Sequence, residues 1–200
     1  MDPHPRPART RTRSRPLGTG ADARARIQRV ALRLFVEEGY DRTSLREIAE
    51  RLGVTKAALY YHFPAKEDIA NSLLEERIAA LDALIDWAER QPDPAKMRLE
   101  FVRRYEAGLY GTDRHAEIVR FLARNPLVLD LLPAGQRLRD RMRRVLVLLA
   151  GADDPPAIRL RRITALLSLH LGDLLPDRPE DEQARRAAAL TVALHTMAGV

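Results

Sequence analysis

The segment from Thr43 to Lys66 constrains the fold of this chain more than any other, because it predicts two short helices joined by a tight turn. Ser44 and Glu47 have the spacing of a capping box, in which a hydroxyl and a carboxylate each bind a backbone N–H at the start of a helix. Gly53 follows the last apolar position and suits the end of that helix. Four apolar residues recur at i, i+3, i+4 and i+7, the spacing of one helix face: Leu45, Ile48, Ala49 and Leu52.

A second short helix is expected over residues 56–61, with Thr55 as its N-cap and Leu59 as its apolar anchor. Phe63 ends it, because a residue that precedes a proline is pushed out of helical geometry. Two short helices around a glycine turn are typical of the helix-turn-helix motif, whose second helix lies in the major groove of DNA. The alternative is a helical hairpin within an unrelated helical protein.

The side chains of this segment suit DNA recognition. Hydroxyl and cationic groups contact phosphate oxygens, while a few side chains of the inserted helix reach the base edges. Ala57 and Ala58 are small enough for a close approach to the groove, and we expect Thr55 and Ala57 to read base sequence. Lys56, Tyr61 and Lys66 are expected to bind phosphates. The predicted DNA-contacting residues are Ser44, Arg46, Thr55, Lys56, Ala57, Ala58, Tyr60, Tyr61, His62 and Lys66.

The run from Ile48 to Glu67 resembles the signature of TetR-family transcriptional regulators, with Gly-Val-Thr, Leu-Tyr-Tyr-His-Phe and a following lysine at the expected spacing. The resemblance extends back over the preceding helix and covers roughly residues 24–70. Beyond residue 70 it is one of length and helix content alone. It implies a dimeric DNA-binding protein in which a long helix, residues 66–90, links the DNA-binding domain to a helical core.

Positive charge is concentrated in the same part of the chain. Residues 1–66 hold fourteen Arg or Lys and seven Asp or Glu, a net charge of +7, so the rest of a chain with a net charge of +6 carries −1. Such a distribution suits a phosphate partner. No apolar run approaches the roughly 18 residues of a membrane span, and no apolar signal-peptide core follows the basic N-terminus. The chain has no cysteine, which excludes disulfides and thiolate metal sites and favours a soluble cytoplasmic protein.

Three regions are expected along the chain. Residues 1–20 are rich in Pro, Arg and Gly and predict a disordered basic arm, because they hold too little apolar surface to offset the entropy of ordering. The arginines of this arm could track phosphates or enter a minor groove; the alternative is a solvated tail that adds non-specific attraction. Residues 21–65 predict a three-helix helix-turn-helix DNA-binding domain. Residues 66–200 predict a helical effector-binding and dimerisation domain.

The whole chain is expected to be all-α, because helical segments alternate with strong breakers and no run shows the alternation of a strand. After the 66–90 helix, further helices are expected at about residues 95–110, 114–124, 134–149, 156–174 and 180–197. The last two carry apolar stripes. The resemblance implies that residues 156–174 and 180–197 pack as a four-helix homodimer interface, although the stripes could instead fill the core of a monomer.

The resemblance also implies a pocket for a small-molecule effector in the second domain. Such pockets are mostly apolar with a few polar groups. Aromatic side chains are therefore the candidates, although aromatic residues at helical spacing are usually ordinary core. The predicted ligand-contacting residues are Trp87, Phe101, Tyr105, Tyr110 and Phe121.

The sequence thus predicts a ligand-responsive transcriptional regulator. By resemblance it is a repressor that binds a pseudo-palindromic double-stranded DNA operator as a homodimer and is released by a small-molecule effector. An enzyme is a competing class, but the chain has no His-Glu-x-x-His motif, nucleophile elbow or glycine-rich phosphate loop. We therefore predict no catalytic residue, cofactor or metal site. A structural DNA-binding protein without an effector is the other competing class, and a second domain without a cavity would favour it.

Overall fold

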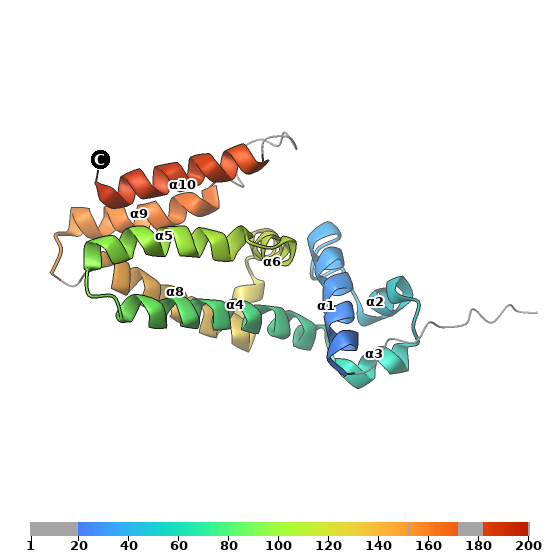
Figure 1. Cartoon of the computed structure of the whole chain (residues 1–200). Helices are drawn as coiled ribbons and strands as arrows, with labels where there is room; N and C mark the ends of the chain where they lie inside the picture. The colour runs from blue at the N-terminus through green and yellow to red at the C-terminus, as the bar shows by residue number, and fades with distance from the viewer. Residues whose placement is uncertain (1–19, 152, 172–181, 200) are drawn as a thin grey trace, which may run out of the picture. The chain divides into compact units, whose positions relative to one another are not determined.

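The computed structural model describes residues 20–151, 153–171 and 182–199. All regular structure in these ranges is helical, which confirms the all-α prediction (Figure 1). The helices are α1 (Gly20–Glu37), α2 (Leu45–Leu52), α3 (Lys56–His62), α4 (Lys66–Glu89), α5 (Pro94–Tyr110), α6 (Asp113–Arg124), α7 (Val128–Leu131), α8 (Pro133–Ala150), α9 (Pro156–Leu171) and α10 (Glu182–Ala198).

The chain divides into two compact units, one ending at Ile69 and the other beginning at Ala70. The boundary falls within α4, whose first turn belongs to the first unit. The predicted arm lies almost entirely outside the described residues, as do residues 172–174 and 180–181 of the predicted interface segments.

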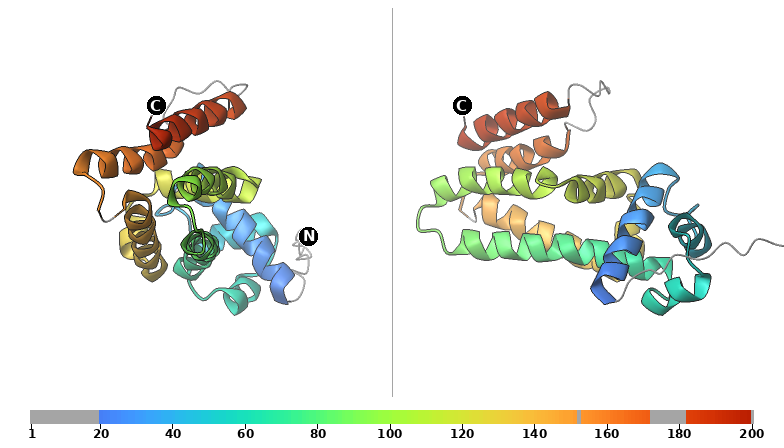
Figure 2. Two further views of the ribbon diagram at one scale, coloured as in Figure 1. Left: turned by 60° about the vertical axis from the view of Figure 1, so that its left-hand side comes forward. Right: turned by 45° about the vertical axis from the view of Figure 1, so that its right-hand side comes forward.

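The first unit is built on α1, which contacts both α2 and α3 (Figure 2). Each helix contributes apolar side chains to one core, and its most deeply buried members are Ile27, Leu32, Leu34, Phe35, Ile48, Leu59 and Phe63. Fully burying one such side chain stabilises a fold by about 1.5–3 kcal/mol. Because α2 and α3 are only two turns long, this burial and their caps hold them in place rather than helix propensity alone.

The predicted capping box at the start of α2 is formed. The backbone N–H of Ser44 donates to Glu47 Oε2 at 2.7 Å, and the Glu47 N–H donates to Ser44 Oγ at 3.3 Å. At the other end Gly53 adopts a left-handed conformation with φ of 69°. The following N–H of Val54 donates to the Ala49 carbonyl at 3.0 Å, which turns the chain toward α3.

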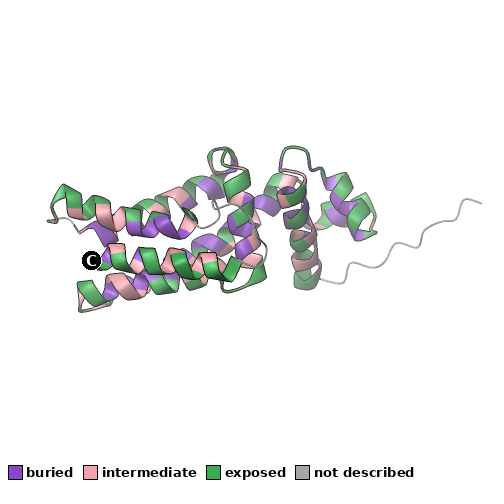
Figure 3. Ribbon diagram, turned by 90° about the horizontal axis from the view of Figure 1, so that it is seen from above, coloured by how far each residue is buried: buried purple, intermediate pink, exposed green. Residues whose placement is uncertain are grey.

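The second unit packs its helices through several pairs. α5 contacts α6 and α10, while α8 contacts α7 and α9. α9 and α10 pack against each other along their length, as Figures 1 and 2 show. Their other sides are largely exposed in the single chain, and Figure 3 shows α10 mostly in the colours of exposed and intermediate residues.

One helix of this unit was not predicted. α7 is a single turn between Pro126 and Pro133, in the stretch between the helices predicted over residues 114–124 and 134–149. Its N–H groups at residues 130–132 find carbonyls within the same turn, so the segment is helical without any side-chain cap. Val128 anchors the turn by burying its side chain. Packing against α8 is thus what orders a segment too short to be stable by itself.

Candidate nucleic-acid interface and internal cavity

The second helix of the motif, α3, is fixed at both ends. Thr55 Oγ1 accepts a hydrogen bond from the Ala58 N–H at 3.2 Å, which caps the N-terminus. At the C-terminus Arg24 Nη1 donates to the His62 carbonyl at 2.6 Å. The Arg24 guanidinium also lies 4.1 Å from the centroid of the Phe63 ring. These contacts, with the buried Leu59, determine which face of α3 is turned outward.

The outward face of α3 carries the predicted recognition residues. Tyr61 is 86% exposed, an unusual state for an aromatic side chain, and Tyr60 is 40% exposed. Lys56 Nζ lies 5.1 Å from the centroid of the Tyr60 ring. Ala57 is exposed beside them. The face therefore offers a cation, two phenol groups and a small side chain to a partner.

A shallow depression of about 370 Å³ lies beside this face in the first unit. Four cationic side chains line it, against one carboxylate, that of Asp41. The full lining is Asp41, Arg42, Thr43, Ser44, Leu45, Arg46, Lys56, Tyr60 and Lys66. An open depression with an excess of cations is suited to phosphate oxygens.

The N-terminus of α2 opens into this depression. Its capping box keeps Glu47 ionised, because hydrogen bonds from the Ser44 N–H and hydroxyl lower the pKa of that carboxyl. Arg46 Nε donates to Glu50 at 2.8 Å, which raises the pKa of that guanidinium. Arg42 Nε donates to the Glu38 carbonyl at 2.6 Å. Sequence reasoning did not select Arg42, although its place two residues before the helix cap was a usable signal.

Lys66 has a different environment from Lys56. Its ammonium donates to three backbone carbonyls, those of Tyr40 at 2.8 Å, Thr43 at 3.2 Å and Asp41 at 3.3 Å. It also lies 4.4 Å from the centroid of the Tyr40 ring. The ammonium is thus directed to the loop between α1 and α2. The phosphate contact predicted for Lys66 would have to compete with these bonds.

Five of the ten predicted DNA-contacting residues line the depression, namely Ser44, Arg46, Lys56, Tyr60 and Lys66. The other five are Thr55, Ala57, Ala58, Tyr61 and His62, which belong to α3 or its cap. The structure thus brings the ten residues to one region of the first unit. Their contacts with DNA stay a prediction.

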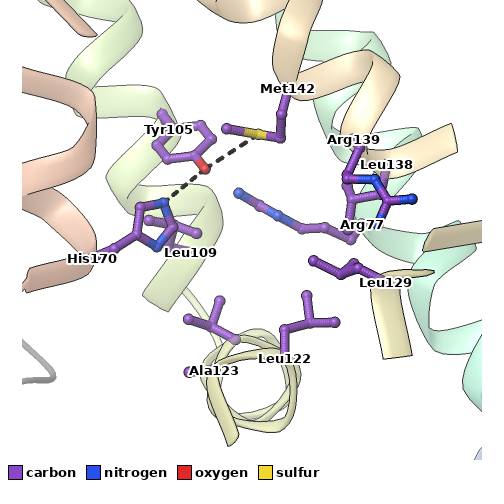
Figure 4. Close-up of a pocket in the computed structure, with 11 residues that line it drawn as sticks. Arg77, Tyr105, Leu109, Leu122, Ala123, Leu129, Leu138, Arg139, Met142 and His170 are labelled. Atoms are coloured by element: carbon purple, nitrogen blue, oxygen red, sulfur yellow. Dashed lines mark hydrogen bonds between the residues drawn. The ribbon is translucent and has the colours of Figure 1, made fainter. Parts of the chain in front are cut away.

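The second unit contains a cavity of about 340 Å³ that is partly open to solvent (Figure 4). Among the predicted ligand residues, Tyr105 lines it. Trp87, Phe101, Tyr110 and Phe121 are not among its lining residues; Phe101 stacks on Tyr105 from within the core, with ring centroids 6.1 Å apart. The lining is mostly aliphatic, with Arg77, Arg139 and His170 as its charged or titratable members.

Within the described ranges, no group of three or more His, Asp or Glu side chains could hold a metal ion. No helix of the described residues is long and apolar enough to cross a membrane. The first unit thus has an exposed helix face beside a cation-lined depression, and the second unit has a partly open, mostly apolar cavity. A three-helix unit that presents its third helix in this way belongs to the helix-turn-helix class of DNA-binding folds.

Part of the chain matches a known protein family. The profile described as "Bacterial regulatory proteins, tetR family" matches residues 27–73. The HTH-type transcriptional regulator AcrR of Shigella flexneri is 50% identical over 46 residues, which is 23% of this chain and 21% of AcrR. The HTH-type transcriptional regulator TcmR of Streptomyces glaucescens is 29% identical over 148 residues, 69% of this chain and 65% of TcmR. The chain thus spans less than two thirds of the length of either relative.

Solved structures extend the likeness of fold across both units. A TetR-family transcriptional regulator from Bordetella parapertussis is 18% identical with a TM-score of 0.69, over 88% of this chain and 95% of that one. A TetR-family member from Streptomyces coelicolor is 22% identical with a TM-score of 0.64, over 87% and 90%. Together these matches support a TetR-family transcriptional regulator, with the family profile covering residues 27–73.

Proposed function

We propose that this protein is a transcriptional regulator that binds a pseudo-palindromic DNA operator as a homodimer and releases it when a small molecule occupies the second unit. The observation that carries the proposal is the outward face of α3, where Lys56 and the 86% exposed Tyr61 stand beside a cation-lined depression. A large aromatic side chain that is mostly exposed, beside the exposed Lys56, is available to a partner. Contact with phosphate and base edges accounts for both.

The dimer is supported by the apolar surface of the last two helices. Leu160, Leu167 and Leu171 of α9 and Val192 of α10 are each between 51% and 65% exposed in the single chain. The three leucines are spaced by seven and four residues, which places them on one face of α9. A two-fold dimer through this face would present two recognition helices to successive turns of the major groove. We propose that the protein represses transcription, since its relatives include a negative transcriptional regulator of a biofilm operon in Staphylococcus epidermidis.

DNA binding is tested by pull-down and sequencing. Purified protein is mixed with fragmented genomic DNA from its source at near-physiological salt, and the recovered fragments are sequenced. Enrichment of a few pseudo-palindromes is the expected result. Lys56→Ala should abolish most of this enrichment, whereas the matched control Lys96→Ala, an exposed lysine at the start of α5, should not. Uniform, salt-sensitive recovery of all fragments would instead identify a non-specific DNA-packing protein.

The dimer is tested separately by light scattering on a sizing column. Leu167→Glu with Leu171→Glu should convert the protein to a monomer, because two charges would be buried in the apolar contact. Leu131→Glu is the matched control, since Leu131 is 67% exposed but lies on α7. A wild-type protein that is monomeric at micromolar concentration would contradict the dimer.

A further inference from the structure

We infer that the cavity of the second unit binds an amphipathic monocarboxylate, with the carboxylate held by Arg77 and the hydrocarbon body held by the aliphatic lining. The inference deepens the proposed function, because it names the chemical class of the effector. The juxtaposition that supports it is a buried guanidinium group projecting into a mostly apolar cavity (Figure 4).

Arg77 is only 8% exposed, which is rare for an arginine. Its Nη1 donates to the Gly108 carbonyl at 3.1 Å, and its Cζ lies 5.0 Å from the centroid of the Tyr105 ring. Its Nη2 is buried and has no hydrogen-bond partner among the described residues. No Asp or Glu in the described part of the chain forms an ion pair with it. The charge is therefore only partly compensated by the protein.

Neighbouring arginines of the same unit form ion pairs with carboxylates. Arg114 pairs with Glu76, one residue before Arg77 on α4, and Arg141 Nε lies 2.7 Å from Asp82 of the same helix. Arg139, the other arginine that lines the cavity, pairs with Asp130 at the surface. Arg77 is thus the lining cation that lacks a carboxylate in the described structure. Burying a charge without a partner is strongly unfavourable, so an anion that completes the site would bind with a large gain.

The rest of the lining determines what kind of anion fits. Leu109, Val119, Leu122, Leu129 and Leu138 form apolar walls, so a small hydrated ion would leave most of the chamber without suitable contacts. At about 30 Å³ for each non-hydrogen atom, as in liquid water, the 340 Å³ chamber holds on the order of ten such atoms. A carboxylate with a hydrocarbon chain or ring of that size satisfies both the cation and the walls.

A second polar group lies beside the guanidinium. The Tyr105 hydroxyl is 3.0 Å from His170 Nε2 and 3.6 Å from the Met142 sulfur. Burial raises the pKa of this phenol, and the nearby Arg77 charge opposes that shift only in part. Tyr105 therefore keeps its proton at neutral pH, and its single O–H donor is directed to Met142 or His170 in this structure. The buried Nη2 of Arg77 is thus the donor that remains for a ligand carboxylate.

The test uses the full-length protein without DNA and measures binding by isothermal titration calorimetry. The probes are octanoate and 3-phenylpropanoate as carboxylates, 1-octanol as a neutral analogue and octylamine as a cation. Both carboxylates should bind, with affinities at least tenfold above that of 1-octanol, and octylamine should not bind. Octanol binding as tightly as octanoate, or failure of both carboxylates at millimolar concentration, overturns the inference.

Arg77→Met preserves the length and the apolar stem of the side chain and removes the charge. It should weaken octanoate binding by on the order of tenfold to a hundredfold and leave octanol binding nearly unchanged, the range expected for loss of a charged hydrogen-bond partner. Arg139→Met is the matched control, because Arg139 lines the same cavity but already has a carboxylate partner, and it should change octanoate binding less than threefold. Equal losses in the two variants would overturn the assignment to Arg77. Circular dichroism verifies that both variants are folded, and Tyr105→Phe, which keeps the ring beside the guanidinium, should change octanoate binding less than Arg77→Met does.

DNA release is measured as a separate readout, so that the two proposals fail independently. Arg77-dependent octanoate binding without any effect on DNA would support the carboxylate site and contradict the effector role. Specific DNA binding that no carboxylate alters, in a protein that binds no carboxylate, would support the regulator and overturn the ligand class.

Discussion

Lys66 provides the sharpest test of how the first unit is held together. Its ammonium makes three hydrogen bonds to the loop between α1 and α2, at 2.8, 3.2 and 3.3 Å, and lies over the Tyr40 ring. A hydrogen bond to a charged group contributes about 1.5–3 kcal/mol, and a cation over an aromatic ring about 0.5–2 kcal/mol. Because the three bonds share one ammonium, they are not additive. We expect Lys66→Met to lower the free energy of unfolding of this unit by about 2–4 kcal/mol.

The same variant separates a structural role from a phosphate contact. Urea unfolding followed by circular dichroism gives the stability, and fluorescence anisotropy on a recovered genomic fragment gives the slope of log affinity against log salt. Lys66→Met should reduce stability and leave the slope unchanged, since its donors face the protein. Lys56→Met should show the opposite pattern, with the slope reduced by about one and stability retained. If Lys66→Met lost less than about 0.5 kcal/mol and reduced the slope by one, Lys66 would be a phosphate ligand and our reasoning would be wrong.

Three further substitutions test local features. Gly53→Ala should lower the free energy of unfolding by about 1–2 kcal/mol in urea, because a backbone φ of 69° is unfavourable for alanine. Steric overlap is not the cause, since no atom lies within 4 Å of the added methyl group. An unchanged urea midpoint would show that the turn can relax. Burial, and next the Glu67 carboxylate, raise the pKa of Tyr40 above its value of about 10 in the unfolded chain. The protonated phenol therefore contributes fully to stability below about pH 10, and this contribution is lost as the pH rises above that value. Tyr40→Phe should therefore lose less stability than wild type between pH 8 and pH 11, and parallel declines would contradict this. Asp154→Asn should destabilise the second unit by about 1–3 kcal/mol, as measured by thermal unfolding. The substitution leaves the Arg98 and Arg162 guanidinium groups close together at the end of α8 without a countercharge. An unchanged melting temperature would refute this reasoning.

The helix-turn-helix could be predicted because its determinants are local. The capping box at Ser44, the left-handed Gly53 and the cap at Thr55 act over three or four residues, and the structure forms each of them as the sequence indicates. Apolar spacing then fixes which faces are buried, as Leu59 illustrates. By contrast, the role of Lys66 depends on carbonyls 23–26 residues away in the chain. A lysine at the start of a helix gives no sign of such acceptors in the sequence, and the phosphate contact of Lys66 stays a prediction.

The cavity illustrates the same limit in the second unit. The sequence predicted five aromatic residues as ligand contacts; two of them fill the core, and Trp87 and Tyr110 are only partly buried, beneath Arg104 and Arg186. Phe101 and Phe121 are fully buried and do not line the chamber. Tyr105 lines it because its hydroxyl needs a polar neighbour, which it finds in His170. The polar tip therefore distinguishes Tyr105 from the other buried rings.

Arg77 could not be selected from the sequence, because α4 carries many charged residues and periodicity gives each of them the same weight. What distinguishes Arg77 is that Glu75 pairs with Arg137, Glu76 with Arg114 and Asp82 with Arg141, so that the carboxylates nearby on α4 are already used by other helices. These pairings join α4 to α6 and α8, and they leave one cation of the helix directed inward without a carboxylate. The ion pairs that hold α4 against α6 and α8 thus also leave Arg77 in the cavity without a carboxylate partner among the described residues. A carboxylate added to the chain itself should therefore compete with the ligand for Arg77. Leu109→Glu places an acid on the cavity lining and should abolish octanoate binding while the protein stays folded. Retained binding in this variant would show that the ligand does not depend on the buried charge.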